Sequence, residues 1–376
     1  MLYNEAMKLN QYVTYFGRKK FSELPFSEVD GLVFSELAYI NFDMYVKEMD
    51  FIKIKDIKIT DKKAFYQGSV DARRNRTLFE TMQKSKRYKD VKIGFCRSYT
   101  DTNTYTQFFA MTLVMPDNSG FIAFRGTDTS ILGWKEDLYL VYQNSMPGQE
   151  KAASYIKEAA HLFAGCFYVG GHSKGGNLAI YATLNMGKKL ERRLLKAYSF
   201  DGPGFEGGIK KFESYPRLKD KLEKYLTTKD MIGVVYNEAD NPKVVYASGV
   251  LLGGHDPFSW DISMSTAKFV YAKDRSSGSK KTEEALMNWL TQESYESKHL
   301  AVSVLMTLFG SARTIYDLLL QAARVIVNRK TIFDGYTVRQ KEEAKETFKR
   351  LGRFILNAYS PKRYLINKET EKENKD

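Results

Sequence analysis

Apolar runs of strand length recur through the middle of the chain. The runs Phe108–Val114 and Phe121–Phe124 flank the segment 116–120, which reads Pro-Asp-Asn-Ser-Gly. Two apolar runs around such turn residues predict a β-hairpin. Further runs of this kind lie at residues 166–169, 197–200, 224–227 and 244–247.

Segments with helical spacing separate these runs. Ala152, Ile156 and Ala159 fall on one face of a helix, and residues 175–185 can present a second apolar face. Alternation of strands with helices is typical of a mostly parallel sheet that is covered by helices. We therefore expect an α/β fold with a mostly parallel central sheet flanked by helices.

Both ends of the chain depart from this alternation. Residues 28–42 have helical spacing, and two long helical stretches, 280–298 and 299–327, follow the last strand-like segment. We expect added helical segments at the N-terminal and C-terminal ends. The expected divisions are a mostly helical segment packed on the core (1–100), the α/β core (101–272), a helical extension (273–360) and a charged flexible tail (361–376).

The segment from Gly171 to Gly176 reads Gly-His-Ser-Lys-Gly-Gly, between an apolar strand and a helix. This context is that of the nucleophile elbow of an α/β-hydrolase, a sharp turn that holds a serine above the sheet. Ser173 is then the nucleophile. Gly171, Gly175 and Gly176 shape the elbow, because larger side chains would clash beside so tight a turn.

The helix behind Ser173 points its free N–H groups at the site, where they favour a developing oxyanion. The first donor is the backbone N–H of Lys174, which directly follows the nucleophile. We expect the side chain of Lys174 to face outward.

A serine nucleophile needs a base, and few histidines are available. In α/β-hydrolases the acid and then the histidine follow the serine along the chain, which leaves His255 and His299. His255 lies in a loop after the last clear strand and is the expected base, whereas His299 lies in a late helix. The chain contains four histidines: His161, His172, His255 and His299.

The acid that orients the base should follow a strand between Ser173 and His255. Asp230 and Asp201 both meet this condition. We favour Asp230, because the later loop is the more usual position for the acid. Asp201 then helps to shape the pocket, and Asp256 caps its own loop.

Several blocks in the same order resemble class 3 lipases. Phe124-Arg125-Gly126-Thr127, followed by Trp134 and Asp137-Leu138, resembles their F-R-G-[ST]…W…D-L block, and the elbow resembles their G-H-S-x-G-G. The resemblance implies the backbone N–H of Thr127 as the second oxyanion donor. It also implies a candidate lid, or a pocket wall, at residues 128–140, which include Trp134.

The chain also departs from that family. Lys174 replaces a typical leucine after the serine, and Asp201 replaces a glycine. The overall pattern resembles more closely the Mbeg-like proteins, a bacterial branch of α/β-hydrolases. That resemblance brings no substrate with it.

Composition adds limits on partners and compartment. The formal net charge of +13 makes an anionic membrane surface a candidate partner. No basic block with interleaved aromatic residues indicates a specific nucleic-acid site, and no Cys/His cluster indicates a metal. The two cysteines, Cys96 and Cys166, and the polar first twenty residues fit a cytoplasmic protein.

These observations predict a cytoplasmic serine hydrolase that cleaves small-molecule or lipid carboxylic esters through an acyl-enzyme, without a cofactor. A thioesterase, acyltransferase or peptidase could use the same residues. The remaining alternative is a non-catalytic binding protein on a hydrolase fold, held at an anionic membrane surface.

Overall fold

The structure is a computed structural model of the whole chain. It describes residues 6–47, 49–69, 71–128, 133, 136–137, 139, 145–237, 241–249, 251–309 and 335–358. The chain forms two compact units, Met1–Arg275 and Ser276–Asp376. Each unit has its own helices and is described by itself below.

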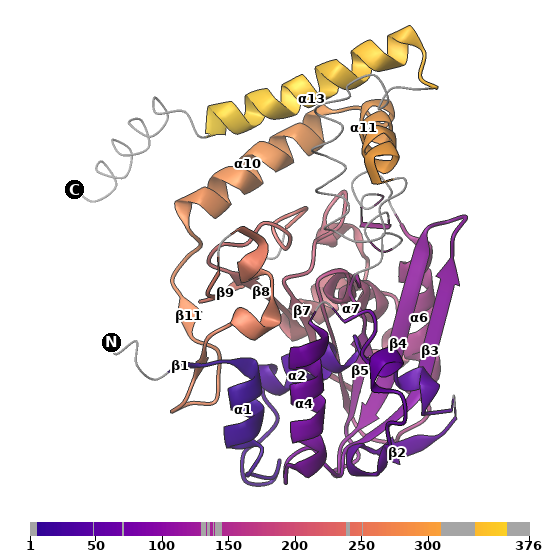
Figure 1. Cartoon of the computed structure of the whole chain (residues 1–376), viewed down its shortest axis with the longest axis vertical. Coiled ribbons are helices and arrows are strands. Elements are labelled where there is room, and N and C mark those ends of the chain that lie inside the picture. Colours follow the sequence, from indigo (N-terminus) through magenta and orange to yellow (C-terminus); the bar gives the residue numbers. More distant parts are fainter. Residues whose placement is uncertain are drawn as a thin grey trace, which may run out of the picture. The chain divides into compact units, whose positions relative to one another are not determined.

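In the described part of the first unit, nine strands form one sheet (Figure 1). Its order is β11-β9-β8-β7-β6-β5-β4-β3-β2. The strands are β2 (Phe51–Lys53), β3 (Lys92–Asp101), β4 (Thr106–Val114), β5 (Gly120–Phe124), β6 (Phe167–His172), β7 (Leu194–Phe200), β8 (Leu222–Thr227), β9 (Lys243–Val245) and β11 (Tyr271–Ala272). A separate pair joins β1 (Ala6–Met7) to β10 (Ile262–Ser263).

The strands β5 to β9 run parallel to one another in the middle of this sheet. The strands β2, β3 and β4 extend it on one side in antiparallel pairing, and β11 closes the other side in the same way. The predicted hairpin is therefore confirmed as β4 and β5. The expected parallel central sheet flanked by helices is also present.

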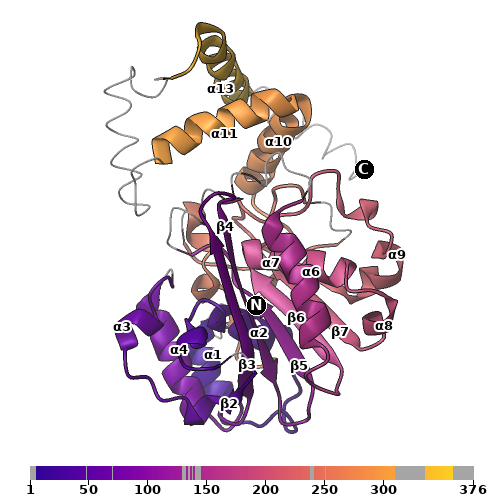
Figure 2. The same cartoon turned by 90° about the vertical axis from the view of Figure 1, so that its right-hand side faces the viewer.

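Helices cover both faces of the sheet, and a hydrophobic core lies on each face. Figure 2 shows α6 and α7 on one side of the strands and α1, α2 and α4 on the other. Alternate residues of β5 serve the two cores: Phe121 and Ala123 pack with the N-terminal helices, and Ile122 and Phe124 pack with α6 and α7. The helices are α1 (Leu9–Phe16), α2 (Glu28–Leu37), α3 (Lys62–Phe65), α4 (Ala72–Lys84), α6 (Pro147–Ala159), α7 (Lys174–Leu184), α8 (Lys188–Glu191) and α9 (Tyr215–Leu218).

The N-terminal segment is part of the first unit. Its helices α1, α2 and α4 contribute buried residues such as Tyr12, Phe34 and Phe79 to the core on one face. Its strands β2 and β3 also belong to the sheet. The first hundred residues, which we expected to be mostly helical, thus add an antiparallel edge as well as a helical layer.

The second unit contains α10 (Ser277–Gln292), α11 (Tyr295–Phe309) and α13 (Val338–Ala358). Leu300, Val304 and Ala344 form a small buried cluster between α11 and α13. In the described part of the chain, no helix is both long enough and apolar enough to cross a membrane. Part of the predicted helix 299–327 and the whole of the predicted tail 361–376 lie outside the described residues.

Candidate functional site

The candidate residues follow the carboxyl ends of neighbouring parallel strands. Thr127 lies three residues after β5, Ser173 directly follows β6, and Asp201 directly follows β7. Asp230 comes after β8 and His255 after β9. In an open α/β sheet, the loops at this edge are where ligands bind. The fold therefore collects all five residues along one edge.

Ser173 occupies a strained position at the turn between β6 and α7. Its backbone has φ 57° and ψ −131°, and positive φ is uncommon for a residue other than glycine. The N–H of Ser173 donates to the carbonyl of Phe200, and the carbonyl of Ser173 accepts from the N–H groups of Gly176 and Asn177. The turn is thus fixed on both sides, which holds the serine in one orientation at the strand end.

The glycines around Ser173 are required by close backbone contacts. A Cβ at Gly171 would lie 2.3 Å from the backbone of Gly175, and a Cβ at Gly175 would lie 2.2 Å from the carbonyl oxygen of Phe124. A Cβ at Gly176 would lie 2.6 Å from the Ser199 hydroxyl. Because these three residues have no side chain, α7 can approach the ends of β5 and β7 closely.

The two residues that the sequence predicted as oxyanion donors lie after β5 and at the start of α7. Among the described residues, no group accepts a hydrogen bond from the N–H of Thr127 or of Lys174. Both residues are buried. Unpartnered donors at the start of a helix and at a neighbouring strand end favour negative charge on a bound ligand.

The side chains of these two donor residues are held by consecutive carboxylates. The Thr127 hydroxyl donates to Asp137 Oδ2 at 2.6 Å. The ammonium of Lys174 forms a buried ion pair with Glu136 and donates to the carbonyl of Gln107 at 3.0 Å. The expectation that the Lys174 side chain faces outward is therefore wrong, because Glu136 offers it a buried charged partner.

Asp137 and Glu136 also belong to the site, although the sequence did not predict a role for either of them. Burial raises the pKa of Asp137 to about 6, while the nearby charge of Lys174 opposes this rise. The sequence contained no signal for Glu136, because a single glutamate between Lys135 and Asp137 is typical of a surface residue. Trp134, the candidate lid or pocket residue, lies outside the described residues.

The carboxylate that contacts His255 is that of Asp201. His255 Nδ1 lies 2.7 Å from Asp201 Oδ2, and the Asp201 side chain is fully buried. Asp201, which we expected only to shape the pocket, therefore makes the contact with His255 that we expected of Asp230. Asp201 has φ 54°, a left-handed conformation that aspartate tolerates better than most residues.

Asp230 lies behind Asp201. Its Oδ1 accepts hydrogen bonds from the backbone N–H groups of Ile232 and Gly233, both at 2.8 Å. A Cβ at Gly233 would lie 2.6 Å from both Asp201 Oδ1 and Asp230 Oδ2, so these two oxygens face the same small space. Burial and the Asp201 carboxylate raise the pKa of Asp230 well above its ordinary value. A protonated Asp230 can therefore donate to Asp201.

His172 links the elbow to the loop of His255. Its Nε2 donates to the carbonyl of His255 at 2.8 Å, and its Nδ1 lies 3.1 Å from the Tyr39 hydroxyl. The two imidazole rings lie 4.6 Å apart. Burial lowers the pKa of both histidines, and that of His172 falls well below its ordinary value. His172 thus stays neutral and supports the backbone beside His255.

The other two histidines take no part in this arrangement. His161 follows the end of α6, and His299 lies on α11 of the second unit. Among the described residues, no group of three or more His, Cys, Asp or Glu side chains could hold a metal ion.

The chain belongs to the Mbeg1-like family, because the model of that family matches residues 82–307, more than half of the sequence. No curated protein sequence matches the chain. One solved structure with some similarity is the Rhizomucor miehei lipase propeptide complex. It shares 15% sequence identity and a TM-score of 0.39, over 75% of this chain and 86% of that chain. This similarity is too low to assign an activity.

Proposed function

We propose that this protein is a serine hydrolase of the α/β-hydrolase superfamily and that it cleaves carboxylic esters. The observation that carries this proposal is the 2.7 Å contact between His255 Nδ1 and buried Asp201, at the sheet edge where strained Ser173 follows β6. A nucleophile, a base and an orienting acid are the elements of acyl transfer by a serine. Membership of the Mbeg1-like family is consistent with hydrolysis.

The contact with Asp201 also assigns the two nitrogens of His255. Because Nδ1–H donates to Asp201, Nε2 is the basic nitrogen. Nε2 takes the proton of the Ser173 hydroxyl as the oxygen attacks the ester carbonyl, and later gives it to the departing alcohol. A water then attacks the acyl-enzyme by the same proton route and releases the acid.

The oxyanion of each tetrahedral intermediate is stabilised by the N–H groups of Thr127 and Lys174. Fixed donors of this kind contribute about 3–4 kcal/mol each in serine hydrolases. Asp137 and Glu136 hold the two donor residues through their side chains, so the donors need little rearrangement as charge develops. This chemistry needs no cofactor.

Labelling with a fluorophosphonate probe tests the proposal, because an activated serine displaces the fluoride of the probe and becomes phosphonylated. We expect the full chain to be labelled at one site, identified by mass spectrometry as Ser173, and we expect Ser173→Ala to abolish labelling. A matched control is Ser199→Ala, which removes a neighbouring strand hydroxyl. Folded wild-type protein that stays unlabelled would contradict the proposal.

A second measurement is needed to identify which class of bond the protein cleaves. We expect turnover of p-nitrophenyl esters, with a preferred acyl length, and slower turnover of acyl thioesters and peptides. Turnover of acyl-CoAs or peptides alone would assign the protein to one of the other acyl-transfer classes.

A further inference from the structure

His255 lies in a loop between two short 3₁₀ helices, η6 (Leu251–Gly254) and η7 (Pro257–Ser259). Gly254, the last residue of η6, and the two loop residues that follow it are held by groups from other parts of the chain. Trp260 Nε1 donates to the carbonyl of Gly254 at 3.1 Å, and His172 Nε2 donates to the carbonyl of His255. The third residue, Asp256, is held by Arg74 from the N-terminal segment, at 2.7 Å.

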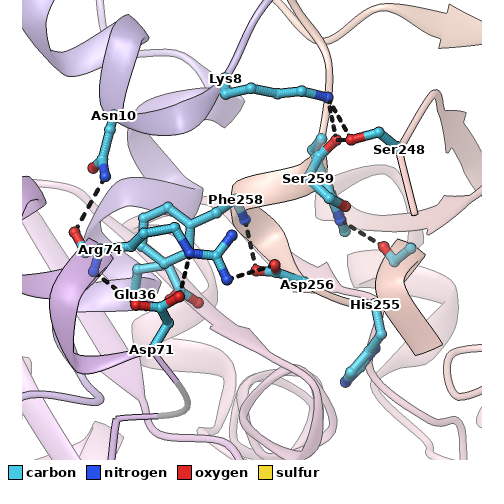
Figure 3. Close-up of polar contacts among 12 residues, drawn as sticks. Lys8, Asn10, Glu36, Asp71, Arg74, Ser248, His255, Asp256, Phe258 and Ser259 are labelled. Atoms are coloured by element: carbon cyan, nitrogen blue, oxygen red, sulfur yellow. Dashed lines mark hydrogen bonds and ion pairs between the residues drawn. The ribbon is translucent and has the colours of Figure 1, made fainter. Parts of the chain in front are cut away.

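Arg74 is fixed at several points, as Figure 3 shows. Its Nε donates to Asp71 at 2.6 Å, and its Nη2 lies 2.7 Å from Asp256 Oδ2. Its guanidinium stacks over the ring of Phe258 at 4.7 Å. The planar guanidinium suits this use, because it can contact two carboxylates and an aromatic face together.

The far ends of these contacts are also anchored. Asp71 is the N-cap of α4 and accepts from the backbone N–H of Arg74. Asp256 accepts from the N–H of Phe258 and so caps η7. A second N-terminal residue, Lys8, reaches the segment after His255 by donating to the carbonyl of Ser259 (Figure 3). Lys8 also donates to Asp261 Oδ1.

We propose that Arg74 is a positioning residue for His255, so that the N-terminal segment is a working part of the hydrolytic site. This inference rests on the proposed function. Arg74 touches neither His255 nor the reacting atoms; it fixes Asp256, the next residue, and thereby the direction of the imidazole. A base displaced by about 1 Å can lose 100-fold in rate, so a contact of this kind has a measurable effect.

Removal of Arg74 should also change the ionisation of His255. Burial lowers the pKa of His255, and Asp256 is one of the carboxyl groups that oppose this shift. Without Arg74, the Asp256 carboxylate acts unopposed and the loop admits more water, and both changes raise the pKa of His255. The other groups that face His255 remain in place: Asp201, Asp230, Asp137 and His172.

The test compares Arg74→Met with Arg76→Met in the full chain. Methionine keeps the apolar contact with Phe258 and removes the charge, and Arg76 lies on the same helix in a surface ion pair with Glu80. For Arg74→Met we expect kcat to fall roughly 10-fold or more, with KM within about twofold. Arg76→Met should keep wild-type values of both.

NMR titration of the histidine side chains gives a readout that does not depend on turnover. The His255 signal is assigned by its loss in His255→Gln. In Arg74→Met we expect its pKa to rise by about half a unit. The double variant Arg74→Met/Asp256→Asn should return it to the wild-type value or lower, while kcat stays low because the loop remains unanchored.

The outcomes separate this inference from the proposed function. If the wild type is labelled at Ser173 but Arg74→Met keeps the wild-type kcat and His255 pKa, the positioning role is wrong and the function stands. If the wild type is neither labelled nor active, the proposed function fails. The His255 signal then decides alone: a raised pKa in Arg74→Met supports the role of Arg74, and an unchanged pKa overturns it.

Discussion

Asp201 and Asp230 place two carboxyl groups in one buried space, at the ends of the neighbouring strands β7 and β8. Two like charges so close and so poorly solvated do not ionise together, so one proton stays on the pair. The hydrogen bonds assign that proton. Asp201 faces an imidazole N–H, whereas Asp230 faces Asp201, so the proton belongs on Asp230 and the charge on Asp201.

This assignment predicts that the same substitution lowers kcat far more at Asp201 than at Asp230. Asp201→Asn should lower kcat by about 10³–10⁴-fold, because an amide cannot hold the imidazole in the required tautomer. Asp230→Asn should stay within about 10-fold of the wild type, because its NH₂ still donates to Asp201 and its oxygen still accepts from Ile232 and Gly233. The check is kcat on a p-nitrophenyl ester, with melting temperature as the folding control. The reverse order would restore Asp230 as the acid.

The pH dependence of the reaction follows from the same residues. Burial lowers the pKa of His255 below its ordinary value, and burial raises the pKa of Asp201 to about 6. The reaction needs neutral His255 and ionised Asp201. Both of these states remain populated until the pH falls to about 6. We expect kcat/KM to stay level down to neutral pH and to fall only near and below about pH 6.

The measurement is a profile of kcat/KM from pH 5 to pH 9, with intrinsic fluorescence recorded in parallel to exclude acid unfolding. An acid limb with an apparent pKa above 7 would show that His255 is more solvated, or more strongly paired, than its surroundings here imply.

At the scale of the elements, the elbow depends on how closely α7 approaches β5. A Cβ at Gly175 would meet backbone atoms, at 2.2 Å for the Phe124 carbonyl oxygen and 3.0 Å for Gly126 N, and neither can move cheaply. Gly175→Ala should therefore shift α7 away from β5, at a cost of about 1–3 kcal/mol or more. It should also abolish fluorophosphonate labelling, because the N–H of Lys174 moves with the helix.

Gly253→Ala is the matched control for this substitution. It lies in η6, two residues before His255, but a Cβ there would meet no atom within 4 Å. Urea unfolding and labelling of both variants give the comparison. Equal stability and labelling in Gly175→Ala and the wild type would show that the close packing at the elbow is dispensable.

The central elements could be predicted from the sequence, whereas the strand β3, which lies between β4 and the edge strand β2, could not. Runs such as 121–124 are buried on both faces and are therefore apolar throughout, which makes them easy to detect. The strand β3 carries charged and polar residues toward its end, and its pairing with β4 shifts register between Gly94 and Arg97. A bulge of this kind breaks the alternation on which strand prediction depends.

The candidate site could be predicted in part for a similar reason. Strand ends and chain order single out Ser173, His255 and two aspartates, but the choice between Asp201 and Asp230 depends on which loop reaches His255. This depends on distances between loops along the sheet edge, and the local sequence pattern does not predict such distances. The burial of Lys174 was missed in the same way, because its partner Glu136 lies 38 residues away in the chain.

At the scale of the whole molecule, the two hydrophobic cores and the candidate site belong to one unit. The cores include residues from Met7 to Phe269, and every candidate residue lies within Met1–Arg275. Residues 8–84 contribute to both structure and site, since they supply one helical layer and the contacts of Lys8 and Arg74. The second unit has a buried cluster of its own.

This division predicts that residues 1–275 fold and react without the rest of the chain. A domain of this size buries enough apolar surface to be stable alone, and its sheet is complete within those residues. We expect the truncated protein to unfold in one cooperative transition and to be labelled at Ser173 at a rate within a few-fold of the full chain.

Truncation at the other end, removing residues 1–84, should abolish both cooperative unfolding and labelling, because it uncovers one face of the sheet. Loss of labelling on removal of residues 276–376, in a protein that still unfolds cooperatively, would instead assign the C-terminal helices a direct part in the reaction.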